Sequence, residues 1–266
     1  MRNRGFFVNV PASVGIDAGS TTFKAVIIDA KGLILRSFLE SADPRIEEQQ
    51  ALALESLNAP KDIPVVATGY GRNRIAAAKT LTEITCHARG AFFRMGEPGI
   101  LIDIGGQDTK IIRVGRGGAV LDFAMNDKCA AGTGRFLEVI LARLRVPMKE
   151  IAKYAARSNR PVSINSTCTV FSESEVISLL ANGEALENIV AGLHAALANR
   201  IASMVGSVSP NSRLFISGGV ALNSVMVDAL SKELSHPLYV VPGPQLVGAL
   251  GAALSALPDW SKAHPR

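Results

Sequence analysis

A segment that occurs twice is the feature of this sequence that most constrains its fold. Residues 14–29 read VGIDAGSTTFKAVIID, and residues 100–114 read ILIDIGGQDTKIIRV. When the two segments are aligned, three residues of each copy match: Asp17 with Asp103, Gly19 with Gly105, and Lys24 with Lys110. Each copy is expected to form an apolar strand ending in Asp-x-Gly, a polar turn, and a second strand starting after the lysine. The chain therefore fits folds that are built from two related halves.

Similar elements follow each copy of the repeat. A third strand is predicted in KGLILRSFLE after the first copy and in GGAVLDFAMND after the second. Apolar residues have helical spacing in RIEEQQALALESL, GRFLEVILARL and ALENIVAGLHAALANRIASMV, and further strands are predicted in IPVVATG, RLFISGGV and HPLYVVPGP. In SESEVISLLANG, Ser172 and Glu175 form a capping-box pattern that predicts a helix start. The order of elements predicts two α/β lobes around a shared cleft, which we place at residues 1–96 and 97–266.

The polar turns of the two copies are candidate phosphate-binding loops. Glycine lets backbone N–H groups approach an anion, and hydroxyl and lysine side chains add donors and positive charge. The candidate contacts are Gly19, Ser20, Thr21, Thr22 and Lys24 in the first turn, and Gly105, Gly106, Gln107 and Asp108 in the second. Asp17 and Asp103 are the candidate catalytic residues, which would hold Mg²⁺ through water and position the attacking water. Two such turns facing each other would clamp the β- and γ-phosphates of a nucleotide.

A third glycine turn lies in LFISGGVALNSVM, where Gly218 and Gly219 separate a predicted strand from a predicted helix. A glycine backbone at this place suits an adenosine, although an ordinary strand-to-helix turn has the same local sequence. The chain has no Walker A loop, and no G-x-G-x-x-G follows the first strand. The sequence therefore supports neither a P-loop nor a Rossmann nucleotide site.

Two of the three cysteines have the same sequence context. Cys129 in NDKCAAGTGRF and Cys168 in NSTCTVFSESE each follow a polar lead and precede small residues and a predicted helix, whose N-terminus stabilises negative charge. Cys86 in ITCHARGA is expected to be a partly buried structural cysteine. The absence of C-x-x-C and of paired histidines disfavours zinc. A redox disulfide and an iron–sulfur cluster both remain open, and the four thiolates of a cluster would require a two-fold dimer.

Composition limits the function classes. No apolar run approaches the roughly 18 residues needed to cross a bilayer, and Pro11 and Asp17 interrupt the N-terminal apolar patch. We therefore expect a cytoplasmic protein without a signal peptide or a membrane partner. The net charge of +5 comes from scattered basic residues without interleaved aromatics, so we expect no nucleic-acid partner.

Five motifs together give the chain a family resemblance: ATGYGRN, IDIGGQDTK, NDKCAAGTGRFLE, STCTVFSESEVIS and GALGAAL. From Val14 to about Leu257 the sequence resembles the activator ATPases (component A) of 2-hydroxyacyl-CoA dehydratases, which belong with the ATPase subunits of benzoyl-CoA reductase in the actin-like superfamily. The resemblance implies an actin-like (ribonuclease H-like) α/β fold with two duplicated lobes and ATP in the cleft between them. The nucleotide contacts that it implies are Ser20 to Lys24 with Phe23 included, Gln107, Gly132, Gly134, Gly218, Gly219 and Gln245.

The resemblance also implies an activity. Cys129 and Cys168 would bind one [4Fe–4S] cluster shared by the two subunits of a homodimer, and reduced ferredoxin or flavodoxin would supply electrons. ATP binding and hydrolysis would then drive single-electron transfer to a 2-hydroxyacyl-CoA dehydratase, with helices starting at Gly134 and Ser172 linking nucleotide and cluster. Other candidate functions are a subunit of benzoyl-CoA reductase, an activator of another double-cluster reductase, an actin-like small-molecule kinase, and a non-enzymatic actin-like assembly protein.

Overall fold

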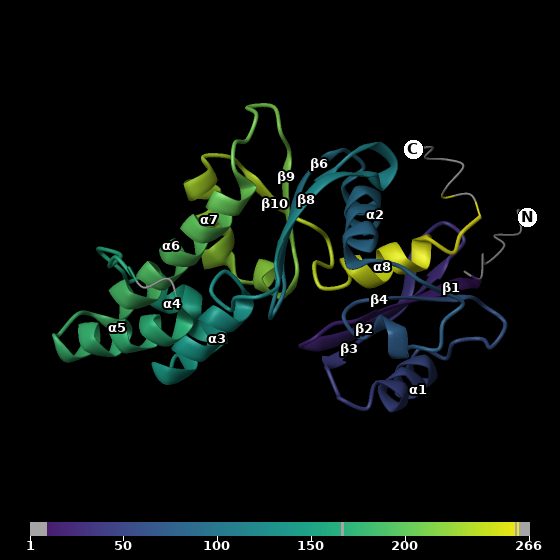
Figure 1. Ribbon diagram of the computed structural model, residues 1–266, viewed down its shortest axis with the longest axis horizontal. Helices are drawn as coiled ribbons and strands as arrows, with labels where there is room; N and C mark the ends of the chain where they lie inside the picture. The colour runs from purple at the N-terminus through teal and green to yellow at the C-terminus, as the bar shows by residue number, and fades with distance from the viewer. Residues whose placement is uncertain (1–9, 166–167, 259, 261–266) are drawn as a thin grey trace, which may run out of the picture. The chain divides into compact units, whose positions relative to one another are not determined.

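The computed structural model describes residues 10–165, 168–258 and 260, and it forms two compact units (Figure 1). The first unit contains the residues up to Phe93, the short segment Arg116–Ala119 and the residues from Leu246 onward. The second unit contains Arg94–Gly115 and Val120–Gln245. None of the described helices combines the length and the hydropathy needed to span a bilayer.

The first unit is a five-stranded sheet with the order β3-β2-β1-β4-β5. Its strands are β1 Pro11–Ala18, β2 Thr22–Asp29, β3 Ile34–Ser41, β4 Val65–Thr68 and β5 Lys79–Thr80. Its helices are α1 Ile46–Ser56, α2 Glu83–Met95, α8 Val247–Leu254 and the short 3₁₀ helices Arg72–Arg74 and Arg116–Gly118. The β1–β2 and β2–β3 pairs are antiparallel, whereas β4 is parallel to β1.

The second unit repeats this topology with the order β8-β7-β6-β9-β10. Its strands are β6 Gly99–Ile104, β7 Thr109–Val114, β8 Val120–Asn126, β9 Leu214–Ser217 and β10 Leu238–Val240. Its helices are α3 Gly134–Arg143, α4 Ile151–Ala155, α5 Thr169–Ala181, α6 Leu186–Val205, α7 Ser224–Leu234 and the 3₁₀ helices Met148–Glu150 and Gly219–Leu222. Helices α3, α5 and α6 pack side by side (Figure 1). Between β8 and β9, which correspond to β3 and β4 of the first unit, the second unit has the additional helices α4, α5 and α6.

Strand register confirms the predicted repeat. Asp17 lies directly opposite Lys24 in the β1–β2 pair, and Asp103 lies directly opposite Lys110 in the β6–β7 pair. The second strand of each copy was predicted to start after the lysine, and this detail is wrong because β2 and β7 start before it. The lysine is therefore inside the ladder, where directly opposed residues of an antiparallel pair share one face of the sheet.

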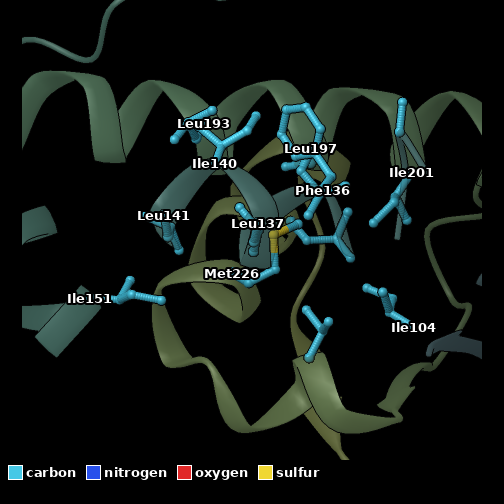
Figure 2. Close-up of a cluster of buried hydrophobic side chains, with 14 of the residues drawn as sticks. Ile104, Phe136, Leu137, Ile140, Leu141, Ile151, Leu193, Leu197, Ile201 and Met226 are labelled. Atoms are coloured by element: carbon cyan, nitrogen blue, oxygen red, sulfur yellow. The ribbon is translucent and has the colours of Figure 1, made fainter. Parts of the chain in front are cut away.

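Each unit has its own apolar core. In the first unit the Phe23 and Phe38 rings pack edge to face with centroids 6.2 Å apart. In the second unit one face of α3 packs against α6 and α7 (Figure 2). The buried side chains of this cluster include Phe136, Leu137, Ile140, Leu141, Leu193, Leu197, Ile201 and Met226. Those of α3 recur at the spacing of an amphipathic helix, which explains why the sequence pattern predicted this element.

Helix α8 packs on the first sheet, although the predicted boundary at residue 96 assigns it to the second lobe. Its leucines and alanines form a core with Val26 and Ile28, and Ala253 O accepts a hydrogen bond of 2.8 Å from Ser13 Oγ. Gly15 on β1 lies so close to α8 that a Cβ there would collide with Ala249 O. An almost wholly apolar helix must be buried, and the first sheet offers the surface that buries it.

Helix α5 starts earlier than its sequence pattern predicted. The capping box at Ser172 and Glu175 is wrong, because α5 begins at Thr169 and Ser172 is buried inside its first turns. Cys168 is the N-cap, and its carbonyl accepts the Ser172 N–H at 2.8 Å. Glu175 instead accepts the backbone N–H of Asn165 at 2.9 Å.

Candidate functional site

The first glycine turn is closed by one backbone hydrogen bond. Gly19 N donates to Thr22 O at 3.1 Å, and a Cβ on Gly19 would lie 2.9 Å from that oxygen, so the turn requires glycine. Ser20 at its tip is exposed, and Thr21 is half-buried. At the end of β1, buried Asp17 faces Lys24, whose Nζ lies 3.3 Å from Asp17 Oδ2. The turn therefore presents N–H groups, hydroxyls and a lysine beside one carboxylate.

Phe23 was included among the nucleotide contacts, but the structure buries its side chain in the core of the first unit. It belongs to β2 and not to the turn. Because successive side chains of a strand point to opposite faces, Thr22 and Lys24 lie on the face away from Phe23. Only the backbone of Phe23 is left to contact a ligand.

The second turn has the same closure and a denser set of charges. Gly105 N donates to Asp108 O at 2.9 Å, which matches the bond between Gly19 and Thr22 in the first turn. Lys110 Nζ lies 3.5 Å from Asp103 Oδ2 and 2.6 Å from Asp108 Oδ2. Asp108 therefore offers a phosphate only its backbone, since its carboxylate is negative and already paired. Gln107 is exposed at the tip and Gly106 is half-buried.

Each candidate catalytic aspartate has a hydroxyl residue beside it on the neighbouring parallel strand. Thr68 lies opposite Asp17 in the β1–β4 pair, and Ser217 lies opposite Asp103 in the β6–β9 pair. Ser217 Oγ donates to Asp103 Oδ1 at 2.6 Å, whereas Thr68 Oγ1 donates to Leu81 O at 3.0 Å. We did not identify Thr68 or Ser217 from the sequence, although a hydroxyl residue before a glycine at each strand end was a usable signal.

A glycine with positive φ follows each of these hydroxyl residues. Gly69 has φ +94° and Gly218 has φ +87°, and a Cβ at either would collide with the backbone of the adjacent strand, at Ala18 and Ile104 respectively. In the second unit Gln245 Nε2 lies 3.7 Å from the place where a Gly219 Cβ would be. The structure thus places Gln245, predicted as a nucleotide contact, beside Gly218 and Gly219, the residues of the predicted adenosine turn.

The cysteine-bearing turn before α3 is bonded directly to the second phosphate turn. Gly134 N donates to Gly105 O, and Arg135 N donates to Gly106 O, both at 2.9 Å. Thr109 Oγ1 donates to Gly132 O at 2.6 Å. Predicted contacts Gly132 and Gly134 therefore lie against the second turn. These bonds use N–H groups of the first helical turn that have no acceptor within the helix, and they tie the start of α3 to the second turn.

Cys129 and Cys168 are exposed and free, and Cys86 is free and buried. Cys129 is held in its turn by Asn126, whose Nδ2 donates to Cys129 O at 2.9 Å. Burial raises the pKa of the Cys86 thiol to about 12, which suits a structural cysteine. In the described part of the chain, no three potential metal ligands of the His, Cys, Asp and Glu types group together. Among the described residues, the exposed thiols are those of Cys129 and Cys168.

Arg200 on α6 lies near both exposed cysteines. Its guanidinium stacks over the Phe136 ring at 5.0 Å, which places it at the core face of α3. Burial lowers the pKa of Arg200, while the charges of Cys129 and Cys168 act in the opposite direction. The charge of Arg200 therefore acts on both thiols. We did not identify Arg200 from the sequence because it is distant from both cysteines along the chain.

A model of the BadF/BadG/BcrA/BcrD ATPase family matches residues 14–256. The chain belongs to this family. It is 42% identical to the 2-hydroxyisocaproyl-CoA dehydratase activator of Clostridioides difficile, over 93% of this chain and 95% of the relative. It is 41% identical to the (R)-2-hydroxyglutaryl-CoA dehydratase activating ATPase of Acidaminococcus fermentans, over 94% of this chain and 98% of the relative.

The solved structure of the C. difficile activator with bound ADPNP has a TM-score of 0.86 to this chain, with 43% identity over 94% of this chain and 96% of that one. The predicted family resemblance is confirmed by these matches, and so is the actin-like, duplicated α/β fold. Within the family, the two turns and the glycines beside them are the elements of this chain that suit a nucleotide. The roles of the individual residues remain predictions.

Proposed function

We propose that this chain is the ATP-hydrolysing activator of a 2-hydroxyacyl-CoA dehydratase or a related reductase, to which it passes single low-potential electrons. Similarity over nearly the whole chain to two proteins named as dehydratase activators carries the proposal. The substrate chemistry would take place on the partner, so this chain needs no acyl-CoA pocket. We expect the exchange to occur in the cytoplasm.

ATP would bind through the two turns, with the adenosine at Gly218, Gly219 and Gln245. Asp17 and Asp103 suit Mg²⁺, because this ion is usually held by one or two carboxylates together with phosphates and waters. Both carboxylates are buried beside a lysine, so each is fixed in place before a ligand arrives. Bound Mg²⁺ would neutralise phosphate charge, and the two aspartates would orient the water that attacks the γ-phosphate.

The exposed thiols suit a [4Fe–4S] cluster shared by two subunits. Cluster ligation normally takes four thiolates, and Cys129 and Cys168 supply two from each chain, so the site is complete only in a homodimer. Both cysteines precede helix starts, where negative charge is stabilised, and Arg200 adds a cation. The bound cluster would supply a one-electron carrier.

The bonds from α3 to Gly105 and Gly106 offer a route between nucleotide and thiols. Closure of the phosphate turn on ATP would pull on the start of α3 and so on the Cys129 turn. One electron enters from reduced ferredoxin or flavodoxin, and the same electron leaves to the partner, while ATP is hydrolysed to ADP and phosphate. The chain thus ends each cycle in its starting oxidation state.

Anaerobic reconstitution with a dehydratase tests this function. We expect the wild-type chain to hydrolyse ATP and to activate the dehydratase when reduced ferredoxin is present. Cys129→Ala and Cys168→Ala should abolish activation but keep nucleotide binding, and Cys86→Ala should activate as the wild type does. A colourless protein that phosphorylates a metabolite would contradict the proposal and would favour a kinase.

A further inference from the structure

Helices α2 and α8 cross in the first unit with their backbones almost touching. Glycines make this possible: a Cβ on Gly90 would collide with Val247 O, and a Cβ on Gly251 would collide with Cys86 O. Arg89 and Ser255 join the same helices through a hydrogen bond of 2.6 Å. The crossing therefore fixes the side chains of α2 relative to β1, against which α8 also packs.

Gly248, in the first turn of α8, lies beside both a histidine and an aspartate. A Cβ there would lie 2.8 Å from His87 Nε2 and 2.9 Å from Asp17 Oδ2. Both residues are buried, at 6% and 4% exposure. The imidazole of His87 on α2 and the carboxylate of Asp17 on β1 thus occupy the space that any larger residue at position 248 would need.

The two oxygens of Asp17 have different surroundings. Oδ2 faces Lys24 Nζ at 3.3 Å, and it borders the space at Gly248 that His87 Nε2 also borders. Oδ1 lies toward the phosphate turn, 3.9 Å from the place where a Gly19 Cβ would be. Groups that hold Oδ2 consequently determine how Oδ1 is presented to a ligand in the turn.

Asp103, the repeat partner of Asp17, is held in another way. Ser217 on β9 donates a hydrogen bond to Asp103 Oδ1 at 2.6 Å. The corresponding residue of the first unit, Thr68, directs its hydroxyl to Leu81 O. The first repeat therefore has an imidazole near its aspartate where the second has a hydroxyl.

We propose that His87 is a positioning residue for ATP hydrolysis, which orients the Asp17 carboxylate so that Oδ1 faces the phosphate turn, and that Gly248 is glycine because these two side chains need its space. The inference rests on the proposed ATPase function. His87 would act through Asp17 and would not itself touch the nucleotide. Its loss should therefore slow hydrolysis and leave ATP binding unchanged.

The test compares His87→Leu, His87→Gln, Gly248→Ala and the control Ser255→Ala, which loosens the same helix crossing without facing Asp17. For each, kcat and KM for Mg–ATP and the melting temperature are measured. We expect His87→Leu and Gly248→Ala to lower kcat by about 100-fold with KM unchanged, as for a misplaced catalytic group. His87→Gln should recover most of kcat because its amide Nε2 can take the place of the imidazole Nε2, and Ser255→Ala should keep the wild-type kcat.

Two results would overturn the role of His87 but leave the proposed ATPase function standing. One is a folded His87→Leu variant with the wild-type kcat. The other is that kcat falls in proportion to the melting temperature in all three variants His87→Leu, His87→Gln and Ser255→Ala. In that case the role of His87 would be structural. Wild-type protein that hydrolyses no ATP would overturn the proposed function, and the role of His87 with it.

Discussion

Ser217 and Asp103 are directly opposite each other on parallel strands, and the Ser217 hydroxyl donates to the Asp103 carboxylate at 2.6 Å in a buried setting. The same carboxylate faces Lys110, which is also buried. This aspartate is therefore fixed on two sides before any nucleotide binds. A fixed carboxylate at the edge of a glycine turn is what positioning of a phosphate-bound metal or water requires.

Replacement of Ser217 by alanine should reduce both stability and hydrolysis. The variant leaves Asp103 with an unmet hydrogen bond in a buried place, which typically costs about 1–3 kcal/mol of unfolding free energy. Chemical denaturation measures the loss of unfolding free energy, and an ATPase assay measures the loss of kcat. Ser231→Ala is the control, because Ser231 Oγ bonds to His236 O at 2.7 Å away from the turns. It should lose some stability and keep kcat, and an equal fall of kcat in both variants would contradict the assigned role.

Gly218→Ala should destabilise the protein more than Gly183→Ala. Both glycines have positive φ, at +87° and +81°, which is unfavourable for alanine, and Gly218 also has ψ 178°, in a region that essentially only glycine adopts. Only at position 218 would the new Cβ also collide with Ile104 O, since Gly183 has no atom within 4 Å of that point. The difference in unfolding free energy measures the collision together with the backbone strain at Gly218.

The same pair of variants tests the adenosine site. Gly218→Ala should weaken ADP binding in calorimetry, because strand and turn must separate to admit the methyl group. Gly183→Ala should bind ADP as the wild type does. Normal ADP affinity in Gly218→Ala would move the adenosine contact elsewhere.

Alkylation should distinguish the three cysteines. Cys129 and Cys168 are exposed and should react with iodoacetamide at pH 8 in cluster-free protein, whereas Cys86 should react only after unfolding. Burial raises the Cys86 pKa from its ordinary value of 9.0 to about 12, so almost no thiolate is present at pH 8. The neutral Cys86 thiol therefore makes its full contribution to the free energy of unfolding below pH 9, and this contribution is lost as the pH rises toward 12. Mass spectrometry of peptides shows which residues are labelled, and rapid labelling of native Cys86 would contradict the burial.

Arg200→Gln should lower the reduction potential of the proposed cluster. A nearby cation stabilises the more negative reduced form, so its loss makes reduction harder, by a shift on the order of tens of millivolts. Arg200→Lys keeps the charge and should retain more of the wild-type potential. Redox titration followed by electron paramagnetic resonance measures the midpoint. A potential that is the same in the wild type and Arg200→Gln would show that Arg200 serves only to pack on Phe136.

The elements of the fold were predictable because their signals are local. The repeat places an aspartate and a lysine seven residues apart in each copy, and a hairpin with a short turn brings such residues together. The start of α5 was misplaced because the pattern at Ser172 and Glu175 is only a propensity. The helix begins three residues earlier at Thr169, where the Cys168 carbonyl accepts its first bond.

The parts of the site that we missed depend on contacts between distant segments. His87 and Asp17 border the same space at Gly248 of α8, whose position on the first sheet also escaped prediction and which crosses α2 through glycines. Arg200 packs over the Phe136 ring of α3, although it is distant along the chain from both cysteines. No local pattern indicates either arrangement, since both arise from close helix contacts that form in the folded core.

Iron and acid-labile sulfide per chain, determined after anaerobic purification, show whether the protein carries the proposed cluster. A [4Fe–4S] cluster held by Cys129 and Cys168 of two subunits predicts about two iron and two sulfide atoms per chain. Both should be lost in Cys129→Ser and Cys168→Ser and kept in Cys86→Ser. Anaerobic wild-type protein that hydrolyses ATP but contains no iron would contradict the account.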